Sequence, residues 1–520
     1  MADSKWKEVA QSEDIEVGKL FSAELSEEES VLIIRRDNGL VAWGDSCPHV
    51  GCPLSWGHLQ NGVITCACHN ARFDVNSGKM LTAPSLDDLV GYDVREENGK
   101  VYIGSRQEPE FPRPAVEDSK TVAIVGAGAG GSAAAEQLRR EGFGGRIVMI
   151  TPEEVSPYDR TALSKFFLGE NMGPELLSLR SSQFYEDANI EMWKGRRVTA
   201  VDTASLTLTM DDGGTLQADH IILATGSRAK TLPIPGTDLP GCFTLRSLAD
   251  ATAIRKAAAE AKSAVVIGAS FIGTETAAFL KDRGLNVHIV APEAVPFAAV
   301  LGEPVGTRFA ALHESQGVGM NPGRTVSRIK GDGKVEEVEL DDGAIIPAEL
   351  VVLGVGAEPV LDYLDGTGLV RDGAVPVDAN LATSASDIYA IGDIARVASD
   401  VQNGRVEHWV VAQRHGQQAA RAVMGDESGL QYAPFFWTMQ FETPLAYTGF
   451  APDFDEVRYK GDVEEGNFLA GYFKGGSLRA VASIGKTKTV IRYGYLLDEG
   501  RKISTEDFDA GLKKMNTGKT

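Results

Sequence analysis

The chain has 520 residues, of which 43% are hydrophobic, so it is long enough to form several domains with separate cores. Its formal net charge of −22 argues against nucleic acid and anionic membranes as partners. No apolar run approaches the roughly 18–20 residues of a membrane helix, and the first residues contain no apolar leader, so we expect no membrane span and a cytoplasmic location, with a mitochondrial one left open.

Residues 1–106 predict an all-β domain. Short runs rich in β-branched and aromatic residues alternate with Asn-Gly and Ser-Gly turns, at 30–36, 39–43, 62–66 and 90–104. Residues 107–118 are proline-rich and predict an extended linker. Residues 1–118 hold 21 acidic and 11 basic residues. This excess is either a solvated acidic surface or a face that attracts a basic redox partner.

A box of cysteines and histidines lies inside this domain. Cys47-Pro-His49 is followed, after 16 residues, by Cys66-x-x-His69. Two thiolates for one iron and two imidazoles for the other are the ligands of a Rieske [2Fe–2S] cluster. Structural zinc usually takes C-x-x-C or H-x-x-x-H spacings, so we favour the cluster over zinc.

A Rieske oxygenase would need a second site, a mononuclear iron held by two histidines and a carboxylate. The remaining histidines show no paired spacing beside a carboxylate on one helix face; they are His58, His220, His288, His313, His408 and His415. We therefore do not expect an oxygenase.

The character of the chain changes at residue 121, where a strand, a glycine turn, an alanine-rich helix and a second strand follow one another. The turn carries Gly126-x-Gly128-x-x-Gly131, which lets a pyrophosphate approach the start of the helix. Glu153, 22 residues beyond Gly131, is placed to accept ribose hydroxyls. The segment therefore predicts a dinucleotide site.

A second unit of the same design begins at residue 263 and carries Gly268-x-Ser270-x-x-Gly273. Serine in place of the middle glycine crowds the pyrophosphate slightly but keeps a hydroxyl donor. Glu293, 20 residues past Gly273, could hold the ribose, and no Lys or Arg lies between Leu285 and Thr307 to bind a 2′-phosphate. We predict NADH rather than NADPH at this unit.

Strands and aromatic residues return after about residue 430 and predict an α+β end domain. The predicted fold is therefore multidomain: an all-β Rieske domain, two α/β Rossmann-like dinucleotide-binding domains and a C-terminal α+β domain. The predicted boundaries are 1–106 for the Rieske domain, 107–118 for the linker, 119–245 and 366–428 for the first dinucleotide-binding domain, 246–365 for the second, NAD(H)-binding one inserted in it, and 429–520 for the C-terminal domain.

Two further segments resemble the later flavin-contacting motifs of the FAD/NAD-linked reductases. One ends a strand in Ala224-Thr225-Gly226, and the other presents Gly392-Asp393. The resemblance implies FAD at the first unit, with Asp393 near the ribityl–phosphate region.

The same resemblance implies roles for charged and aromatic residues near the flavin. Arg160 and Lys165 are expected near its phosphates and ring, and Glu275 is expected to pair with Lys165 beside the contact of flavin and nicotinamide. Trp409 and Trp437 fall in family segments that approach the ring, although core packing explains either equally well. Lys165 and Glu275 are the predicted catalytic pair.

The cysteine–histidine box resembles the Rieske proteins of respiratory bc complexes and arsenite oxidase. That resemblance implies a disulfide between Cys52 and Cys68, with a reduced pair of buried thiols as the alternative. Ala71 and Phe73 stand where high-potential Rieske proteins have hydroxyl residues, which predicts a lower potential. Asn70 replaces the usual glycine, and the sequence does not explain it.

In its order of parts, the whole chain resembles the Rieske-fused branch of the apoptosis-inducing-factor-like (AIF-like) flavoproteins, which are similar to NADH-dependent ferredoxin reductases. This implies an oxidoreductase that passes electrons from NADH through FAD and the cluster to an external acceptor protein, such as an oxygenase or a haem protein. Alternatives are direct reduction of a small molecule or quinone, and redox signalling. We expect a monomer or homodimer. Cys242 is expected to be a buried small side chain rather than a nucleophile.

Overall fold

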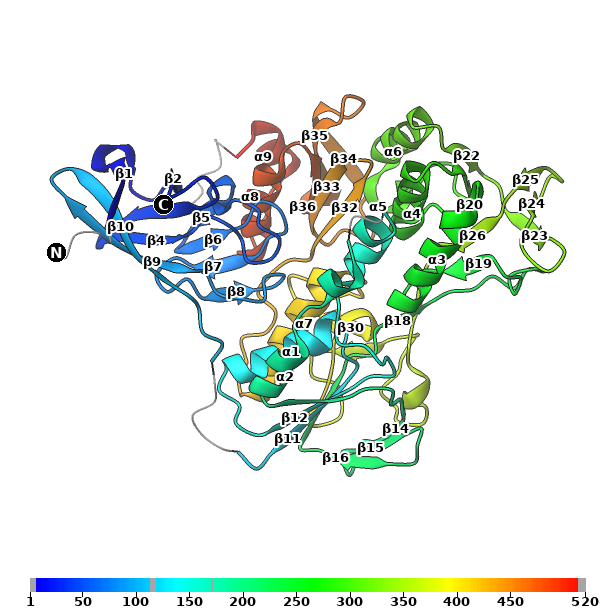
Figure 1. Ribbon diagram of the computed structural model, residues 1–520, viewed down its shortest axis with the longest axis horizontal. Helices are drawn as coiled ribbons and strands as arrows, with labels where there is room; N and C mark the ends of the chain where they lie inside the picture. Colours follow the sequence, from blue (N-terminus) through cyan, green and yellow to red (C-terminus); the bar gives the residue numbers. More distant parts are fainter. Residues whose placement is uncertain (1–5, 113–117, 170–171, 513–520) are drawn as a thin grey trace.

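The computed structural model of the chain describes residues 6–112, 118–169 and 172–512. Figure 1 shows the N-terminal domain in blue beside the C-terminal domain in red and orange, with the two dinucleotide-binding units in cyan, green and yellow. Within the described ranges, no helix has the length and apolar character required to span a membrane.

Two antiparallel sheets build the N-terminal domain. The first has the order β1 (Lys7–Gln11), β10 (Lys100–Gln107), β9 (Gly91–Glu97), β4 (Gly39–Gly44), β3 (Ser30–Arg36), β2 (Phe21–Glu24). The second has the order β5 (His58–Gln60), β6 (Val63–Thr65), β7 (Arg72–Asp74), β8 (Met80–Thr82). Val31 and Ile33 of β3 enter one core, and Leu32 and Ile34 enter another beneath the cysteine-rich loops. The all-β prediction is confirmed.

The first dinucleotide unit is a parallel sheet in the order β13 (Ile190–Trp193), β12 (Arg146–Ile150), β11 (Thr121–Val125), β17 (His220–Leu223), β29 (Ile388–Ala390). Helices α1 (Ala129–Arg140) and α7 (Trp409–Val423) pack closely on each other. A Cβ at Gly416 of α7 would lie 2.2 Å from the Gly130 carbonyl oxygen of α1, so the two backbones are in contact. Smaller elements complete the unit: α2 (Ser182–Asp187), β14 (Val198–Asp202), β15 (Thr207–Met210), β16 (Thr215–Gln217), β18 (Ser227–Ala229), β27 (Ala357–Pro359), β28 (Val375–Val377), β30 (Ala395–Ala398) and β31 (Asn403–Gly404).

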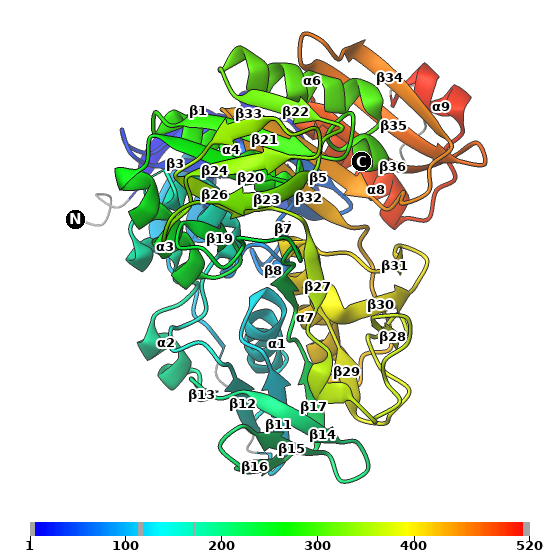
Figure 2. The ribbon, with the colours of Figure 1, turned by 90° about the vertical axis from the view of Figure 1, so that its right-hand side faces the viewer.

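The second unit repeats the design, with parallel strands in the order β19 (Cys242–Thr244), β26 (Leu350–Leu353), β20 (Ser263–Ile267), β21 (Asn286–Ala291), β22 (Gly319–Pro322) (Figure 2). Its other elements are α3 (Leu248–Glu260), α4 (Phe271–Asp282), α5 (Ala298–Leu301), α6 (Glu303–Ser315), β23 (Val326–Lys330), β24 (Glu337–Leu340) and β25 (Ile345–Pro347). Strand β19 lies inside the range predicted for the first unit, yet it pairs with the second sheet.

The C-terminal domain is an antiparallel sheet in the order β32 (Phe435–Gln440), β33 (Thr443–Gly449), β36 (Ser477–Ile484), β35 (Asn467–Lys474), β34 (Glu456–Asp462), followed by α8 (Thr487–Asp498) and α9 (Thr505–Ala510). Helix α8 buries Val490, Tyr493 and Leu496 in the same core as Phe435 of the sheet. This is the predicted α+β fold.

The N-terminal domain packs against both the first dinucleotide unit and the C-terminal domain. The carbonyl oxygen of Leu86 accepts hydrogen bonds from Arg140 (2.6 Å) and Arg180 (2.7 Å) of the first dinucleotide unit. On the other side, the Thr65 hydroxyl is hydrogen-bonded to the Tyr495 hydroxyl of α8. The cysteine-rich loops therefore face the rest of the molecule.

Candidate functional site

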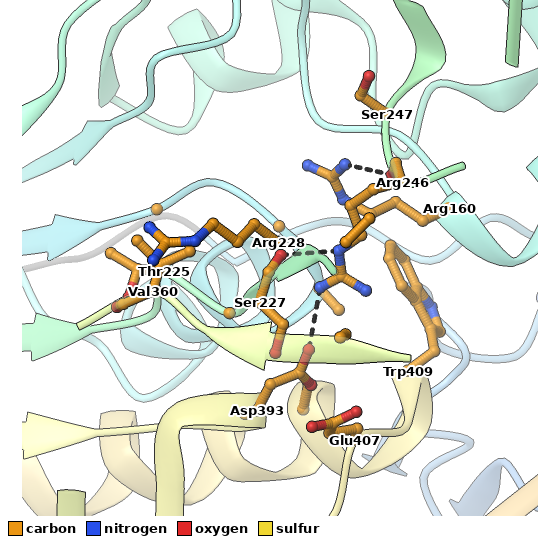
Figure 3. A pocket seen from close by; sticks show the side chains of 18 of the residues that line it. Arg160, Thr225, Ser227, Arg228, Arg246, Ser247, Val360, Asp393, Glu407 and Trp409 are labelled. Atoms are coloured by element: carbon orange, nitrogen blue, oxygen red, sulfur yellow. Dashed lines mark hydrogen bonds and ion pairs between the residues drawn. The ribbon is translucent and has the colours of Figure 1, made fainter. Parts of the chain in front are cut away.

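A cavity of about 1020 Å³ opens between the two dinucleotide units and the C-terminal domain (Figure 3). The sequence-predicted residues that line it are Gly126, Gly128, Glu153, Arg160, Lys165, Ala224, Thr225, Gly226, Ser270, Glu275, Gly392, Asp393, Trp409 and Trp437. Four predicted cofactor residues lie outside its lining: Gly131, Gly268, Gly273 and Glu293. The structure thus brings most of the predicted residues together in one place.

The first glycine turn has the geometry of a pyrophosphate cradle. Gly126 has φ +111°, and a Cβ there would lie 2.3 Å from the Ala224 carbonyl oxygen. A Cβ at Gly131 would lie 1.9 Å from the Gly126 oxygen, so Gly131 allows α1 to begin tight against β11. At Gly128, the N-cap of α1, a Cβ would meet nothing within 4 Å. The open side of the turn and the helix N-terminus fit a dinucleotide.

Two carboxylates in the cavity are held by arginines. Glu153 is paired with Arg160 and accepts a hydrogen bond from the Tyr158 hydroxyl at 2.7 Å. Asp393 accepts from Arg246 at 2.9 Å (Figure 3). Both carboxylates therefore keep fixed positions and retain lone pairs toward the cavity.

Sequence reasoning missed Arg246 and Tyr158. A local sequence signal near Arg246 was present. The next residue, Ser247, forms a capping box with Asp250 in which each side chain bonds the other's backbone, and this motif predicts the start of α3. The cap fixes the chain direction, and Arg246 precedes it at the cavity wall. Tyr158 carries no comparable local pattern.

A buried ion pair lies at the floor of the cavity. Lys165 Nζ is 2.8 Å from Glu275 Oε2, and their side chains are 5% and 4% exposed. Glu275 also accepts from the hydroxyls of Ser164 (2.6 Å) and Thr438 (2.7 Å). Two segments far apart in the sequence, 163–167 and β32, thus fix one carboxylate of α4, as expected for a group that orients ligands.

The second glycine turn differs from the first. Ser270 is the N-cap of α4: its hydroxyl accepts from Gly273 N at 3.2 Å and donates to the Gly354 oxygen at 2.9 Å. The hydroxyl that the sequence offered to a pyrophosphate is therefore engaged within the protein. Glu293 lies exposed just beyond the end of β21, and its role in NADH binding stays a prediction.

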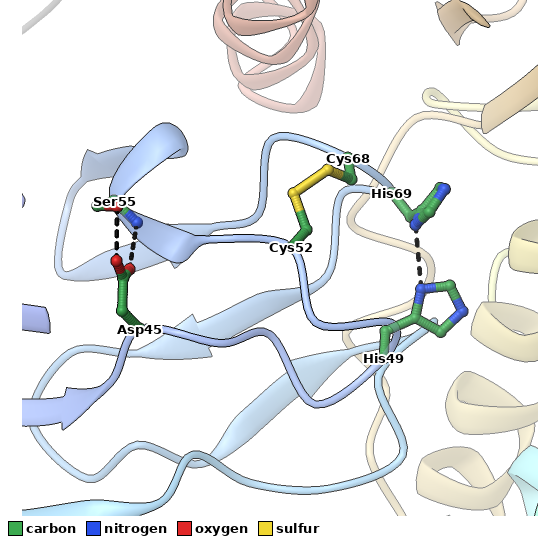
Figure 4. Close-up of a disulfide and its surroundings, with 6 residues drawn as sticks. All are labelled: Asp45, His49, Cys52, Ser55, Cys68 and His69. Carbon is green, nitrogen blue, oxygen red and sulfur yellow. Dashed lines mark hydrogen bonds between the residues drawn. A yellow bond between two sulfur atoms is a disulfide. The ribbon is translucent and has the colours of Figure 1, made fainter. Parts of the chain in front are cut away.

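The cysteine–histidine box forms a second, adjacent site (Figure 4). Cys47 and Cys66 are both buried, and their interaction raises the pKa of the Cys47 thiol and lowers that of the Cys66 thiol. His49 Nδ1 lies 3.1 Å from His69 Nδ1. Burial, then the charges of His49 and Lys165, lower the pKa of His69 to about 3. Two sulfurs and two neutral imidazoles converge, which is a donor set that fits a Rieske cluster.

The predicted disulfide between Cys52 and Cys68 is present in the structure, with the two Cα atoms 6.4 Å apart. It joins the two loops that carry the predicted cluster ligands (Figure 4). The pairing therefore ties these two loops together.

One aromatic side chain connects the two sites. The ring of Trp437 in β32 lies 5.0 Å from Lys165 Nζ, and its centroid lies 4.6 Å from that of His69. Trp437 also lines the cavity. The cavity and the predicted cluster ligands are therefore separated by a single ring.

Cys242 is half-buried rather than fully buried, and it lies outside the lining of the cavity. Burial, with a smaller effect of Asp238, raises its pKa to about 11. Because the thiolate is the reactive form, we expect iodoacetamide to label Cys242 slowly at pH 8 and progressively faster as the pH rises toward 11. Peptide mass spectrometry of the native protein measures this rate; fast labelling at pH 7 would contradict the assignment.

Three family models match the chain. Residues 5–93 match the Rieske [2Fe-2S] domain, residues 120–416 match pyridine nucleotide-disulphide oxidoreductase, and residues 435–515 match the reductase C-terminal domain. These matches follow the order of the domains in the structure.

Curated relatives span most of the chain. Apoptosis-inducing factor 3 of Homo sapiens is 34% identical over 98% of this chain and 87% of its own length. The ferredoxin--NAD(+) reductase subunit of the benzene 1,2-dioxygenase system of Pseudomonas putida is 34% identical over 70% of this chain and 88% of its own. Among solved structures, the covalent putidaredoxin reductase–putidaredoxin complex matches with TM-score 0.73 and 28% identity, over 76% of this chain and 98% of that one.

These matches agree with the cavity and the cysteine–histidine box. They imply FAD, a [2Fe–2S] cluster and NADH as cofactors and reductant, and oxidoreduction as the reaction. The chain therefore belongs to the pyridine nucleotide-disulphide oxidoreductase family, as an AIF-like, ferredoxin-reductase-type enzyme with an N-terminal Rieske domain.

Proposed function

We propose that this chain passes electrons from NADH, through FAD in the large cavity, to its own Rieske cluster and then to an external one-electron acceptor protein. The observation that carries the proposal is the position of Trp437, which contacts both Lys165 in the cavity and the predicted cluster ligand His69. A reductase and its ferredoxin are thus joined in one chain and already in contact.

When bound, FAD would supply a hydride acceptor that can pass on two electrons singly, and a [2Fe–2S] cluster would supply a one-electron carrier. The protein's own residues orient these groups. The turn at Gly128 admits the pyrophosphate, Asp393 and Glu153 offer fixed carboxylates to hydroxyl groups, and Lys165 presents a positive charge held in place by Glu275. Cys47, Cys66, His49 and His69 would hold the cluster.

The external acceptor is proposed by analogy with relatives that serve dioxygenase systems. The excess of acidic residues in the first 118 positions would favour a basic acceptor protein. A cytoplasmic location and a monomeric or homodimeric state remain predictions.

Cys66→Ser tests the route. We expect the variant to lose the cluster and to reduce cytochrome c, used as a haem-protein probe, at least about tenfold more slowly, since removal of a cluster ligand abolishes metal binding. Reduction of ferricyanide, which can take electrons from the flavin, should remain. Iron content and the EPR signal of the reduced protein confirm the loss.

Cys242→Ser is the matched control, because it removes a thiol outside both sites. Unchanged cytochrome c reduction in Cys66→Ser would contradict the route through the cluster. It would favour direct reduction of the acceptor from the flavin cavity.

A further inference from the structure

The cluster loop is held from outside its own domain. Asn70, the residue after His69, has φ +63°, a left-handed conformation that asparagine tolerates better than most residues. Its carbonyl oxygen accepts from Arg414 Nη2 at 2.9 Å, and its side-chain oxygen accepts from the same nitrogen at 3.2 Å. Arg414 belongs to α7 of the FAD-binding unit, 344 residues away in the sequence.

Arg414 is a buried guanidinium, 6% exposed, and no carboxylate pairs with it in the part of the chain that the structure describes. Its other hydrogen bond goes to the Ala433 carbonyl oxygen at 3.3 Å. Burial, then the neighbouring charge of Arg72, lower the pKa of Arg414 to about 9, so it stays protonated at neutral pH. The charge of Asp498 acts in the opposite direction but offsets these effects only in part. A buried cation without a full counter-charge is costly, so a negative charge nearby would stabilise it.

The neighbouring arginine is arranged differently. Arg72, which unlike Arg414 belongs to the cluster domain itself, is paired with Asp498 at 2.6 Å, and its Nε donates to the Asn70 side chain at 3.2 Å. Asp498 in turn accepts from Ala433 N at 2.7 Å. Arg72 is therefore neutralised by Asp498, and Arg414 supplies the net positive charge beside the loop.

We propose that Arg414 is a positioning residue for the Rieske cluster: it fixes the loop that carries His69 and provides the positive charge that favours cluster reduction. Reduction adds one negative charge to the cluster, and a buried cation stabilises that charge more strongly than it would in water. This contribution comes from the FAD-binding unit. It partly offsets the missing hydroxyl donors at Ala71 and Phe73.

The inference rests on the cluster assigned above, but not on the route from NADH. It is therefore tested by potentiometric titration of the purified full-length protein with dithionite and mediators, with the cluster followed by EPR. Arg414→Gln should lower the equilibrium constant for cluster reduction about tenfold, which is a fall of about 59 mV for one electron.

Arg421→Gln is the matched control, because it removes the same charge from the same helix. Arg421 also bonds the N-terminal domain, through the Leu81 carbonyl oxygen at 3.1 Å, but it is partly exposed and paired with Glu141. In Arg421→Gln, the equilibrium constant for cluster reduction is expected to change less than about twofold, because solvent screens the charge of an exposed ion pair.

Two further variants separate charge from structure. Asp498→Asn keeps an acceptor for Ala433 N but removes a negative charge, so it should favour cluster reduction, the opposite sign to Arg414→Gln. Arg414→Lys retains the charge and should lie close to the wild-type potential. If Arg414→Gln does not fold, these two variants decide the test.

The proposal fails if Arg414→Gln leaves the potential unchanged, or if Asp498→Asn and Arg414→Gln shift it in the same direction. It also fails if Arg414→Lys lowers the reduction potential of the cluster as much as Arg414→Gln does. A failure of the NADH route alone would leave these equilibrium potentials unaffected, so the two proposals fail separately.

Discussion

Replacement of Trp437 by leucine is expected to slow electron transfer from the flavin to the cluster by about ten- to a hundredfold, because a small misplacement of reacting groups has effects of this size. The indole ring fills the space between Lys165 and His69. Leucine leaves a gap there and removes the aromatic contact with the imidazole. Hydride transfer from NADH should be much less affected, since the Lys165–Glu275 pair stays in place.

Anaerobic stopped-flow mixing with NADH measures both steps in one experiment. Bleaching of the flavin absorbance reports hydride transfer from NADH. The slower change in cluster absorbance reports electron transfer from the flavin to the cluster. Trp437→Phe is the control, because it keeps a ring between the two sites and should retain most of the rate. Equal cluster reduction rates in wild type and Trp437→Leu would show that electrons take another path.

Glu275→Gln should destabilise the FAD-loaded protein by about 3–5 kcal/mol, the usual effect of removing one partner of a buried ion pair. Glutamine fits the same space: its amide oxygen can accept from the hydroxyl of Ser164 or of Thr438, and its amide nitrogen can donate to the other. It removes the counter-charge of Lys165, whose ammonium group would then be buried without an anion. Urea unfolding, followed by circular dichroism, measures the free energy of unfolding.

The double variant Lys165→Met with Glu275→Gln provides the control for this prediction. Removal of both charges should recover part of the lost stability, because no unpaired ion remains. If the double variant is less stable than the wild type by the sum of the separate effects of Glu275→Gln and Lys165→Met, the pair does not interact.

Local patterns were sufficient to predict the fold class of each part of the chain and the two glycine turns. The turn at Gly126 and the cysteine–histidine box each depend on residues within about 30 positions, where spacing reflects backbone geometry directly. The run of four buried residues in β3, from Val31 to Ile34, likewise follows from neighbouring residues. Such features need no knowledge of the rest of the chain.

Contacts between domains could not be predicted in this way. Asn70 looks anomalous in its own loop, and its partner Arg414 lies 344 residues away. From the sequence, core packing and a place near the flavin explained Trp437 equally well. Only the assembled fold shows that Trp437 lies beside His69. The sequence assigned the Ser270 hydroxyl to the pyrophosphate. It could not show that this hydroxyl donates instead to the Gly354 oxygen, because Gly354 lies in a loop distant in the sequence.

The seating of the N-terminal domain has a kinetic consequence. A ferredoxin that diffuses freely meets its reductase at a rate proportional to its concentration. Here Leu86, Asn70 and Thr65 already anchor the module on three neighbouring elements, so this transfer is first order and insensitive to dilution. His69 is half-buried against Trp437, so a foreign ferredoxin would have to displace this module in order to approach the cavity on that side. The chain itself supplies one cluster site for each flavin site.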